Sequence, residues 1–175
     1  MYIIISSTNR RHAVTWKLCL IYKRLLSKRG LEVETIDLHK LPHDYLASAL
    51  YENSGKNHDF NAYRNLMLKA QKYIFIVPEY NGSFPGVLKA FIDGLQFPET
   101  FTNKKCALVG LSSGVQGAGL ALSHLTDIFN YCGMNVLAFK PKLARIEENM
   151  DMSELVLTDL YQQLLEEQVE KLVEF

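Results

Sequence analysis

The chain has no excess of charge of either sign and no long hydrophobic run. Its 175 residues include 19 Lys and Arg and 19 Asp and Glu, so the formal net charge is zero. A chain without net charge has no overall field that would attract nucleic acid or an anionic membrane. No segment approaches the roughly 20 consecutive apolar residues of a membrane-spanning helix. These absences argue against nucleic-acid and membrane partners.

Cysteine is scarce, and its pattern excludes a disulfide framework or a cysteine-based metal site. Cys19, Cys106 and Cys132 are odd in number, far apart, and outside any Cys-x-x-Cys pair. Each has apolar neighbours, which favours a small buried side chain over a redox group. The first residues also lack the charged and apolar regions of a signal peptide, so we expect a cytoplasmic location.

Short apolar segments alternate with amphipathic ones along the whole chain. Strands are predicted at residues 3–5, 31–38, 73–77, 106–111 and 135–139, and helices at residues 13–27, 59–71, 83–94, 120–131 and 153–173. Residues 41–57 are predicted to be a long excursion with one short helical turn, suited to a lid or a contact surface. The length fits one domain covering residues 1–175. The alternation predicts an α/β fold: a flavodoxin-like three-layer α/β/α sandwich whose five-stranded parallel sheet has the order 2-1-3-4-5.

The stretch from residue 73 to residue 94 is the most informative part of the sequence. Its apolar run suits a strand buried on both faces, and Pro78 cannot continue the hydrogen-bond ladder. Asn81 and Gly82 then favour a turn, after which Ser83 is a candidate helix cap and Pro85 an early helical residue. A polar loop at the carboxyl end of a parallel strand is where open α/β sheets bind ligands.

The predicted strand order brings three such loops to one edge of the sheet. We call them loop one (residues 6–15), loop three (residues 78–86) and loop four (residues 112–119). Loop one is rich in hydroxyl groups and contains Arg10, and loop four contains three glycines. Hydroxyl groups, a guanidinium and the amino terminus of a helix together suit a phosphate group.

Loop three also carries a specific resemblance. Pro-Glu-Tyr-Asn-Gly-Ser-x-Pro-Gly-x-Leu-Lys-x-x-Ile-Asp, from Pro78 to Asp93, resembles the signature loop of the NAD(P)H-dependent FMN reductases. The resemblance implies FMN as cofactor, NADPH or NADH as electron donor, a small-molecule electron acceptor and a homodimer or homotetramer. The cofactor-binding residues that it implies are Thr8, Arg10, Thr15, Pro78, Glu79, Tyr80, Asn81, Gly82, Ser112, Ser113 and Gly114. It implies no catalytic side chain, because the flavin itself accepts and delivers the electrons.

Loop one departs from the family pattern at two positions. Ser7 stands where a glycine is typical, and Ala13 stands where a phosphate-binding serine is typical. Loss of one hydroxyl donor costs about 1 to 2 kcal/mol, or about tenfold in affinity, unless Arg11 or His12 compensates. An alternative function is therefore a flavodoxin-like binding or regulatory module with a weakened FMN site.

A hydrolase is a further alternative, because residues 110–114 fit the pattern Gly-x-Ser-x-Gly by letter. A serine nucleophile needs an acid and then a histidine farther along the chain. The one histidine beyond Ser112 is His124, and no acidic residue lies between them. The sequence therefore argues against hydrolysis.

Aromatic residues near loop three predict a surface for self-association. Phe97 and Phe101 follow the helix after loop three, and Tyr80 and Phe84 lie within the loop. Such a cluster is expected to form an exposed apolar patch, and patches of this kind usually mark contact surfaces.

Overall fold

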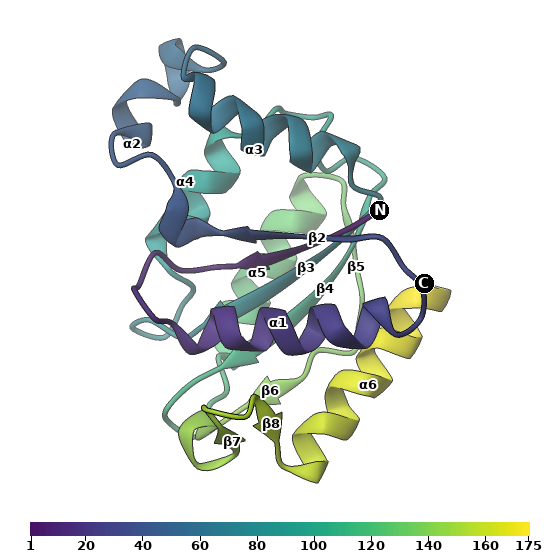
Figure 1. Ribbon diagram of the computed structural model, residues 1–175. Coiled ribbons are helices and arrows are strands. Elements are labelled where there is room, and N and C mark those ends of the chain that lie inside the picture. The colour runs from purple at the N-terminus through teal and green to yellow at the C-terminus, as the bar shows by residue number, and fades with distance from the viewer.

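A parallel β-sheet runs through the centre of the computed structural model, which describes residues 1–175 (Figure 1). Its strands are β1 (Tyr2–Ser6), β2 (Val33–Asp37), β3 (Lys72–Pro78), β4 (Lys105–Leu111), β5 (Asn135–Val136) and β6 (Lys142–Leu143). Their order is β2-β1-β3-β4-β5, with β6 also paired to β4, and every pair is parallel. The predicted order is confirmed.

Helices cover both faces of this sheet. The α-helices are α1 (Val14–Ser27), α2 (Tyr45–Ser48), α3 (His58–Lys69), α4 (Gly86–Gly94), α5 (Gly119–Tyr131) and α6 (Asp159–Glu174). Helices α1 and α6 pack on one face, and α3, α4 and α5 pack on the other (Figure 1). The predicted three-layer α/β/α sandwich is therefore confirmed.

Alternating side chains of each central strand supply the two cores. In β3, Phe75 and Val77 join the core beneath α3, α4 and α5, whereas Ile74 and Ile76 join the core beneath α1 and α6. These cores contain 27 and 22 buried residues, so neither face of the sheet is left to solvent. A strand covered on both faces must be apolar throughout, which explains the unbroken run at residues 73–77.

The last strand of the sheet is interrupted, which differs from the single strand predicted at residues 135–139. β5 pairs with Lys105 and Cys106, and the chain then leaves β4 before β6 returns to Gly110 and Leu111. Gln168 of α6 fills the gap, because its buried amide donates to the carbonyl oxygens of Leu108 and Phe139, each at 2.9 Å. The sheet therefore continues beyond the predicted last strand, since β6 follows Pro141.

The final helix begins at Asp159, six residues after the predicted start at residue 153. Asp151 Oδ1 accepts hydrogen bonds from the backbone N–H groups of Ser153 and Glu154, at 2.8 and 3.0 Å. This turn joins the short strands β7 (Met150–Asp151) and β8 (Val156–Leu157), which pair antiparallel. Ser153 is therefore part of a hairpin and does not cap α6.

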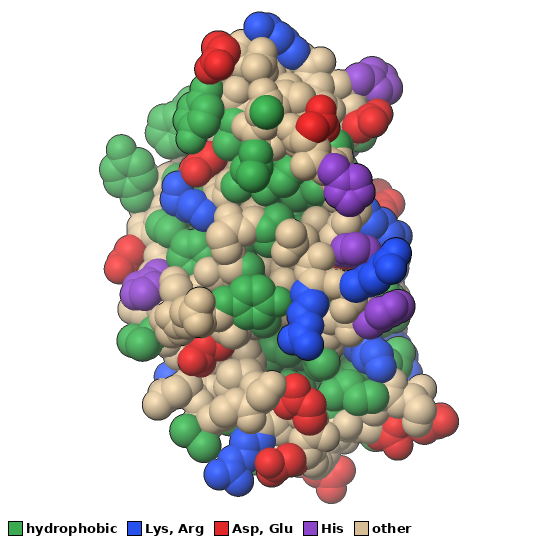
Figure 2. All heavy atoms as spheres, turned by 90° about the vertical axis from the view of Figure 1, so that its left-hand side faces the viewer, with side chains coloured by type: hydrophobic (Ala, Val, Ile, Leu, Met, Phe, Trp, Pro, Cys, Tyr) green, Lys and Arg blue, Asp and Glu red, His purple; other side chains and the backbone are tan.

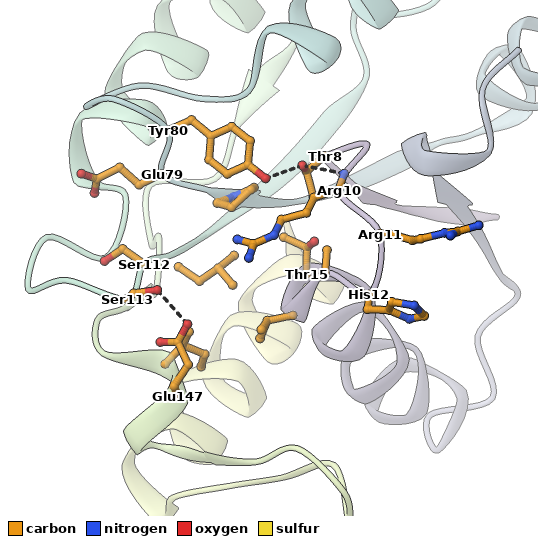
Figure 3. A pocket seen from close by; sticks show the side chains of 15 residues that line it. Thr8, Arg10, Arg11, His12, Thr15, Glu79, Tyr80, Ser112, Ser113 and Glu147 are labelled. Atoms are coloured by element: carbon orange, nitrogen blue, oxygen red, sulfur yellow. Dashed lines mark hydrogen bonds between the residues drawn. The ribbon is translucent and has the colours of Figure 1, made fainter. Parts of the chain in front are cut away.

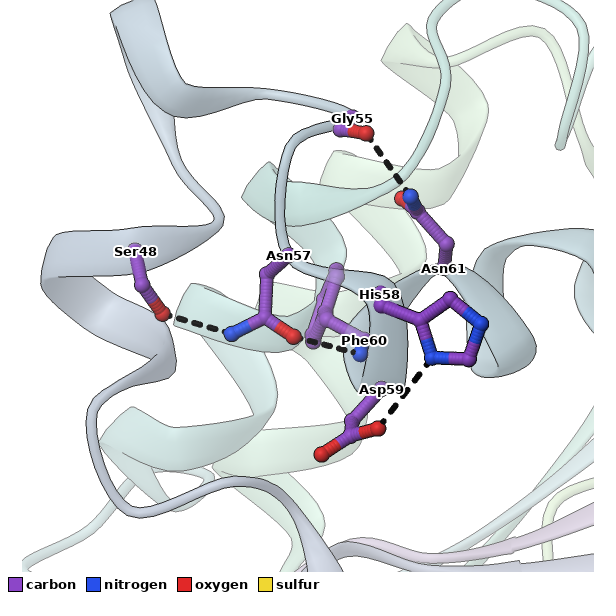
Figure 4. Close-up of polar contacts among 7 residues, drawn as sticks. All are labelled: Ser48, Gly55, Asn57, His58, Asp59, Phe60 and Asn61. Carbon is purple, nitrogen blue, oxygen red and sulfur yellow. Dashed lines mark hydrogen bonds and ion pairs between the residues drawn. The ribbon is translucent and has the colours of Figure 1, made fainter.

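The excursion between β2 and α3 contains more helical turns than the single one predicted. It holds the 3-10 helices η1 (Leu38–Lys40) and η2 (Tyr51–Asn53) around α2, and a third, η3 (Ile146–Glu148), lies later in the chain. Asn57 anchors the excursion to α3 (Figure 4): its amide oxygen accepts from Phe60 N–H at 2.8 Å, and its amide nitrogen donates to Ser48 at 2.6 Å. The cap of α3 thus also orders the preceding loop.

An apolar groove of about 870 Å³ lies between α4 and α5 and the end of this excursion. Its exposed aromatic residues are Tyr51, Phe97 and Tyr131, whose exposed fractions are 79%, 67% and 86%. The predicted aromatic patch is wrong in three members, because Phe101 is only 3% exposed, Phe84 packs against the core, and Tyr80 lines a different cavity. None of the helices combines the length and apolar character needed to cross a bilayer.

Candidate functional site

Loops one, three and four meet around one cavity at the carboxyl ends of β1, β3 and β4. Its volume is about 310 Å³, at the lower end of the range for ligand pockets. Figure 2 looks onto this end of the sheet, where Lys, Arg and His side chains gather on the right and hydrophobic ones surface at the centre and left. The lining residues are Thr8, Arg10, Arg11, His12, Ala13, Val14, Thr15, Pro78, Glu79, Tyr80, Leu111, Ser112, Ser113, Ile146 and Glu147. The expected convergence of the three loops is therefore confirmed.

Loop three is a tight hairpin turn. Tyr80 and Ser83 exchange backbone hydrogen bonds of 2.8 and 3.0 Å. Asn81 and Gly82 between them have φ values of 51° and 72°, which is the two-residue type I′ turn that Asn-Gly favours. Asn81 and Gly82 shape the loop and do not line the cavity. The prediction that Ser83 caps a helix is wrong, since α4 begins at Gly86 after Pro85.

Glu79 connects loop three to loop four. Its carboxylate accepts a hydrogen bond from the backbone N–H of Ala118 at 3.1 Å. Ala118 precedes α5, has a φ of 64° and offers no capping side chain, and the first turn of α5 contains no acid. Glu79 therefore supplies the negative partner that this helix terminus lacks.

Tyr80 connects loop three to loop one. Its phenol oxygen lies 2.7 Å from Thr8 Oγ1, which also accepts the backbone N–H of Arg10 at 3.2 Å (Figure 3). Tyr80 thus forms a wall of the cavity and touches the loop predicted to hold phosphate.

Loop one presents hydrogen-bond donors and contains no acidic residue of its own. Helix α1 follows Ala13, which makes no side-chain cap, and its first turn contains no acidic residue. Arg10 points into the cavity and has no salt-bridge partner, whereas Arg11 and His12 point away from it (Figure 3). Thr15 lines the cavity and accepts a hydrogen bond from Ser6 at 3.3 Å. The orientation of Arg11 and His12 gives no support to the idea that they replace the missing serine hydroxyl.

The hydroxyl group of Ser112 is used within loop four. It donates to Gly114 O and accepts from Gly117 N–H, both at 2.9 Å. His124, the only downstream histidine, lies 2.9 Å from the hydroxyl of Ser83. Ser112 therefore has neither a free hydroxyl nor a neighbouring base, and a serine hydrolase is not supported. Gly114 lies in this loop but does not line the cavity.

The segment after β6 contributes a wall that the sequence did not predict. Ile146 and Glu147 of η3 line the cavity, and Ser113 donates to the Glu147 carboxylate at 2.7 Å (Figure 3). Two backbone bonds hold the segment against loop four, from Arg145 N–H to Gly114 O and from Ile146 N–H to Ser112 O. No sequence signal identified these residues, because they depend on the return of β6 to β4. Val14 and Leu111 were also missed, since apolar residues at element ends carry no distinctive pattern.

The donor set fits FMN. Phosphate requires N–H groups, hydroxyls and a cation, which the start of α1, Thr8, Thr15 and Arg10 provide. The flat ring requires an apolar surface, which Val14, Leu111 and Ile146 provide beside Tyr80. No group of three or more His, Cys, Asp or Glu side chains is placed to hold a metal ion.

Comparisons with known proteins agree with this geometry. Residues 2–140 match the family model described as NADPH-dependent FMN reductase. The chain is 27% identical over 151 residues to an NAD(P)H-dependent FMN reductase of Pseudomonas aeruginosa, covering 82% of this chain and 77% of that protein. It is 33% identical over 85 residues to a 2-hydroxy-1,4-benzoquinone reductase of a Burkholderia species, a match that spans 47% of this chain and about half, 46%, of that protein. The apo form of an NADH:FMN oxidoreductase superposes with a TM-score of 0.81 at 20% identity, over 99% of this chain and 89% of that one. At that identity the superposition shows the shared fold.

Proposed function

The chain belongs to the NADPH-dependent FMN reductase family, and we propose that it is an oxidoreductase that binds FMN and passes electrons from NADH or NADPH to a small-molecule acceptor. The observation that carries this proposal is the single cavity in which a phosphate-type donor set in loop one faces the walls formed by loops three and four.

Loop one holds the phosphate end of the cofactor in this proposal. Arg10 supplies a guanidinium that forms no salt bridge with a carboxylate of the chain. Thr8, Thr15 and the first N–H groups of α1 supply further donors. Together they favour a dianionic group over a neutral one.

Loops three and four hold the ring end. Pro78, Glu79 and Tyr80 form one wall, shaped by the turn at Asn81 and Gly82, and Ser112 and Ser113 form the opposite edge. Bound FMN supplies the redox chemistry, accepting a hydride from nicotinamide and delivering electrons to the acceptor. The residues of the chain position the ring and its partners, and none needs to act as acid or base.

Quinones are the acceptor class that we favour. The support is that one relative is named a 2-hydroxy-1,4-benzoquinone reductase and another an NAD(P)H:quinone oxidoreductase, from Solanum tuberosum. A planar quinone can stack where nicotinamide stacks, so the two substrates would use the same open side of the ring in turn.

Anaerobic mixing of FMN-loaded protein with NADH or NADPH tests the activity. The flavin absorbance band should bleach and then return when a quinone is added. Ser112→Ala should keep this cycle, whereas a serine hydrolase would lose its activity. Stable oxidised flavin with both donors would instead support the flavodoxin-like binding module, an alternative favoured by the uncapped Ala13.

We also propose that two chains associate through the apolar groove to form a homodimer, which could pair again into a tetramer. Exposed Tyr51, Phe97 and Tyr131 around one groove are the support, since large exposed apolar patches usually mark contacts. Light scattering should give twice the 20.0 kDa of one chain, and Tyr131→Glu should restore the monomer. Leu160→Glu is the matched control, because Leu160 is 62% exposed on α6, away from the groove. A monomeric wild-type protein with FMN present would contradict this proposal.

Residues 1–175 are proposed to form one domain, located in the cytoplasm. Both cores pack on the same sheet, which supports the single domain. The three cysteines are unpaired, as suits a reducing compartment. Burial raises the pKa of the Cys19 and Cys106 thiols, which makes them poor nucleophiles. Cell fractionation tests the location, and recovery only outside the cytoplasm would contradict it.

A further inference from the structure

The hydroxyl group of Thr8 is shared between loop one and loop three. Thr8 is only 1% exposed, yet it lines the cavity. Its Oγ1 accepts the backbone N–H of Arg10 at 3.2 Å and lies 2.7 Å from the phenol oxygen of Tyr80, and either of these two hydroxyl groups can be the donor (Figure 3).

The direction of the Thr8–Tyr80 hydrogen bond decides what Thr8 can offer a ligand. A threonine hydroxyl has one proton to donate and two lone pairs to accept with. If Thr8 donates to Tyr80, its proton is used and it has none for a ligand. If Tyr80 donates to Thr8, the Arg10 N–H and the phenol occupy both lone pairs, and the Thr8 proton is free to point into the cavity.

An anion in loop one selects the second arrangement. A phosphate oxygen only accepts hydrogen bonds, so it favours the state in which Thr8 donates to it and Tyr80 donates to Thr8. Hydrogen bonds linked in this way strengthen one another. A ligand without phosphate has no group that selects this direction.

We propose that Tyr80 is a specificity-determining residue: its phenol, by donating to Thr8, turns Thr8 into a donor toward phosphate and so favours FMN over riboflavin. This inference rests on the proposed function, because it requires that the cavity bind flavin with its phosphate in loop one. Tyr80 then has two separable parts, a ring that forms the wall for both flavins and a hydroxyl that serves only the phosphorylated one.

A purely structural tie between the loops makes a different prediction. If the hydroxyl of Tyr80 only held loop three against loop one, its removal would disturb the wall that both flavins share. FMN and riboflavin would then lose affinity equally. The ratio of the two affinities therefore distinguishes the two roles.

The experiment is a fluorescence titration of apoprotein with FMN and with riboflavin. The variants are Tyr80→Phe, Thr8→Val, the double variant, and Tyr63→Phe as control. Tyr63 also donates one phenol hydrogen bond, to Lys40 O at 3.0 Å, but lies outside the cavity. Thermal unfolding of each variant shows that it is folded.

Tyr80→Phe should lower the affinity for FMN roughly three- to tenfold and the affinity for riboflavin less than twofold. Thr8→Val should weaken FMN at least as much, and adding Tyr80→Phe to it should have little further effect, because the relay is already broken. Tyr63→Phe should change neither affinity.

Two results would overturn the inference. One is that Tyr80→Phe lowers the affinities for FMN and riboflavin equally. The other is that the fold-loss of FMN affinity in the double variant equals the product of the two single fold-losses. If riboflavin binds too weakly to titrate directly, its displacement of bound FMN gives the ratio of the two affinities. Failure of the wild-type protein to bind FMN would instead overturn the proposed function.

Discussion

Loop three and loop one border the same cavity but are held in opposite ways. In loop three the turn is closed by two backbone hydrogen bonds, and Glu79, Tyr80 and Ser83 each bond to another part of the chain. In loop one the side chain of Arg10 has no salt-bridge partner, and Ala13 leaves the start of α1 uncapped.

This difference fits what we propose that each loop binds. A ring needs a surface of fixed shape, so loop three is ordered by contacts within the protein. A phosphate needs donors that no internal acceptor has taken, and loop one keeps the guanidinium of Arg10 free of salt bridges and the start of α1 uncapped. We therefore expect the ring end of the cavity to be ordered before FMN binds and the phosphate end to become ordered when it binds.

The largest expected effect comes from disturbing the packing of Gly110 in β4 against loop four. A Cβ atom there would lie 2.2 Å from the backbone oxygen of Gly117, which cannot move without displacing loop four. Gly110→Ala should lower the free energy of unfolding by about 3 kcal/mol, measured by urea denaturation. Gly114→Ala is the control, since a Cβ at Gly114 meets nothing within 4 Å, and it should change stability by less than about 0.5 kcal/mol. Equal stabilities for the two variants would contradict the packing described for loop four.

Removing the guanidinium of Arg10 from loop one should weaken FMN binding and leave the fold intact. Arg10→Ala should weaken FMN binding by about 1.5 to 3 kcal/mol, because a charge-assisted hydrogen bond is lost. Arg11→Ala should have a much smaller effect, since that side chain points away from the cavity (Figure 3). Titration of both apoproteins with FMN measures this contrast, and an unchanged midpoint for Arg10→Ala would remove Arg10 from the site.

Straining the turn of loop three should have an intermediate effect. Gly82 has a φ of 72°, a conformation that an L-residue adopts at a cost. Gly82→Ala should destabilise the protein by about 1 to 2 kcal/mol, seen as a lower midpoint of urea unfolding. Gly86→Ala, at the start of α4 with open space around its Cβ position, should be neutral or slightly stabilising. A stable Gly82→Ala protein would show that the turn tolerates other geometries.

The smallest expected effect comes from giving loop one the helix cap that it lacks, by replacing Ala13 with serine. Ala13→Ser should stabilise α1 by about 0.5 to 1 kcal/mol as a helix cap. It should also tighten FMN binding by up to about tenfold, if the hydroxyl reaches the phosphate. Calorimetric unfolding and FMN titration separate the two effects. A gain in stability without a gain in affinity would mean that the hydroxyl serves only the helix.

The sheet and loop three could be predicted because their signals are local. The apolar run at residues 73–77 requires a strand buried on both faces, and Asn81-Gly82 requires a tight turn. The direct neighbours of these residues settle their conformation, so no distant contact is needed.

The missed features depend on contacts between distant parts of the chain. Gln168 occupies a helical position that sequence alone assigns to the surface, but the gap between β5 and β6 needs its amide. Ile146 and Glu147 reach the cavity only because β6 returns to β4. The start of α6 was misplaced because Asp151 closes a turn with Ser153 and Glu154, two residues that also resemble a helix start.

Amide hydrogen exchange with and without FMN tests the contrast between the two loops most directly. In the apoprotein, the hydrogen-bonded amides of Glu79, Tyr80 and Ser83 should already be protected, and those of residues 9–15 should exchange faster. FMN should slow exchange chiefly at residues 9–15, with a smaller change at residues 79–83. Equal protection of both segments before FMN is added, or slowing confined to the groove around Tyr51, Phe97 and Tyr131, would contradict the account.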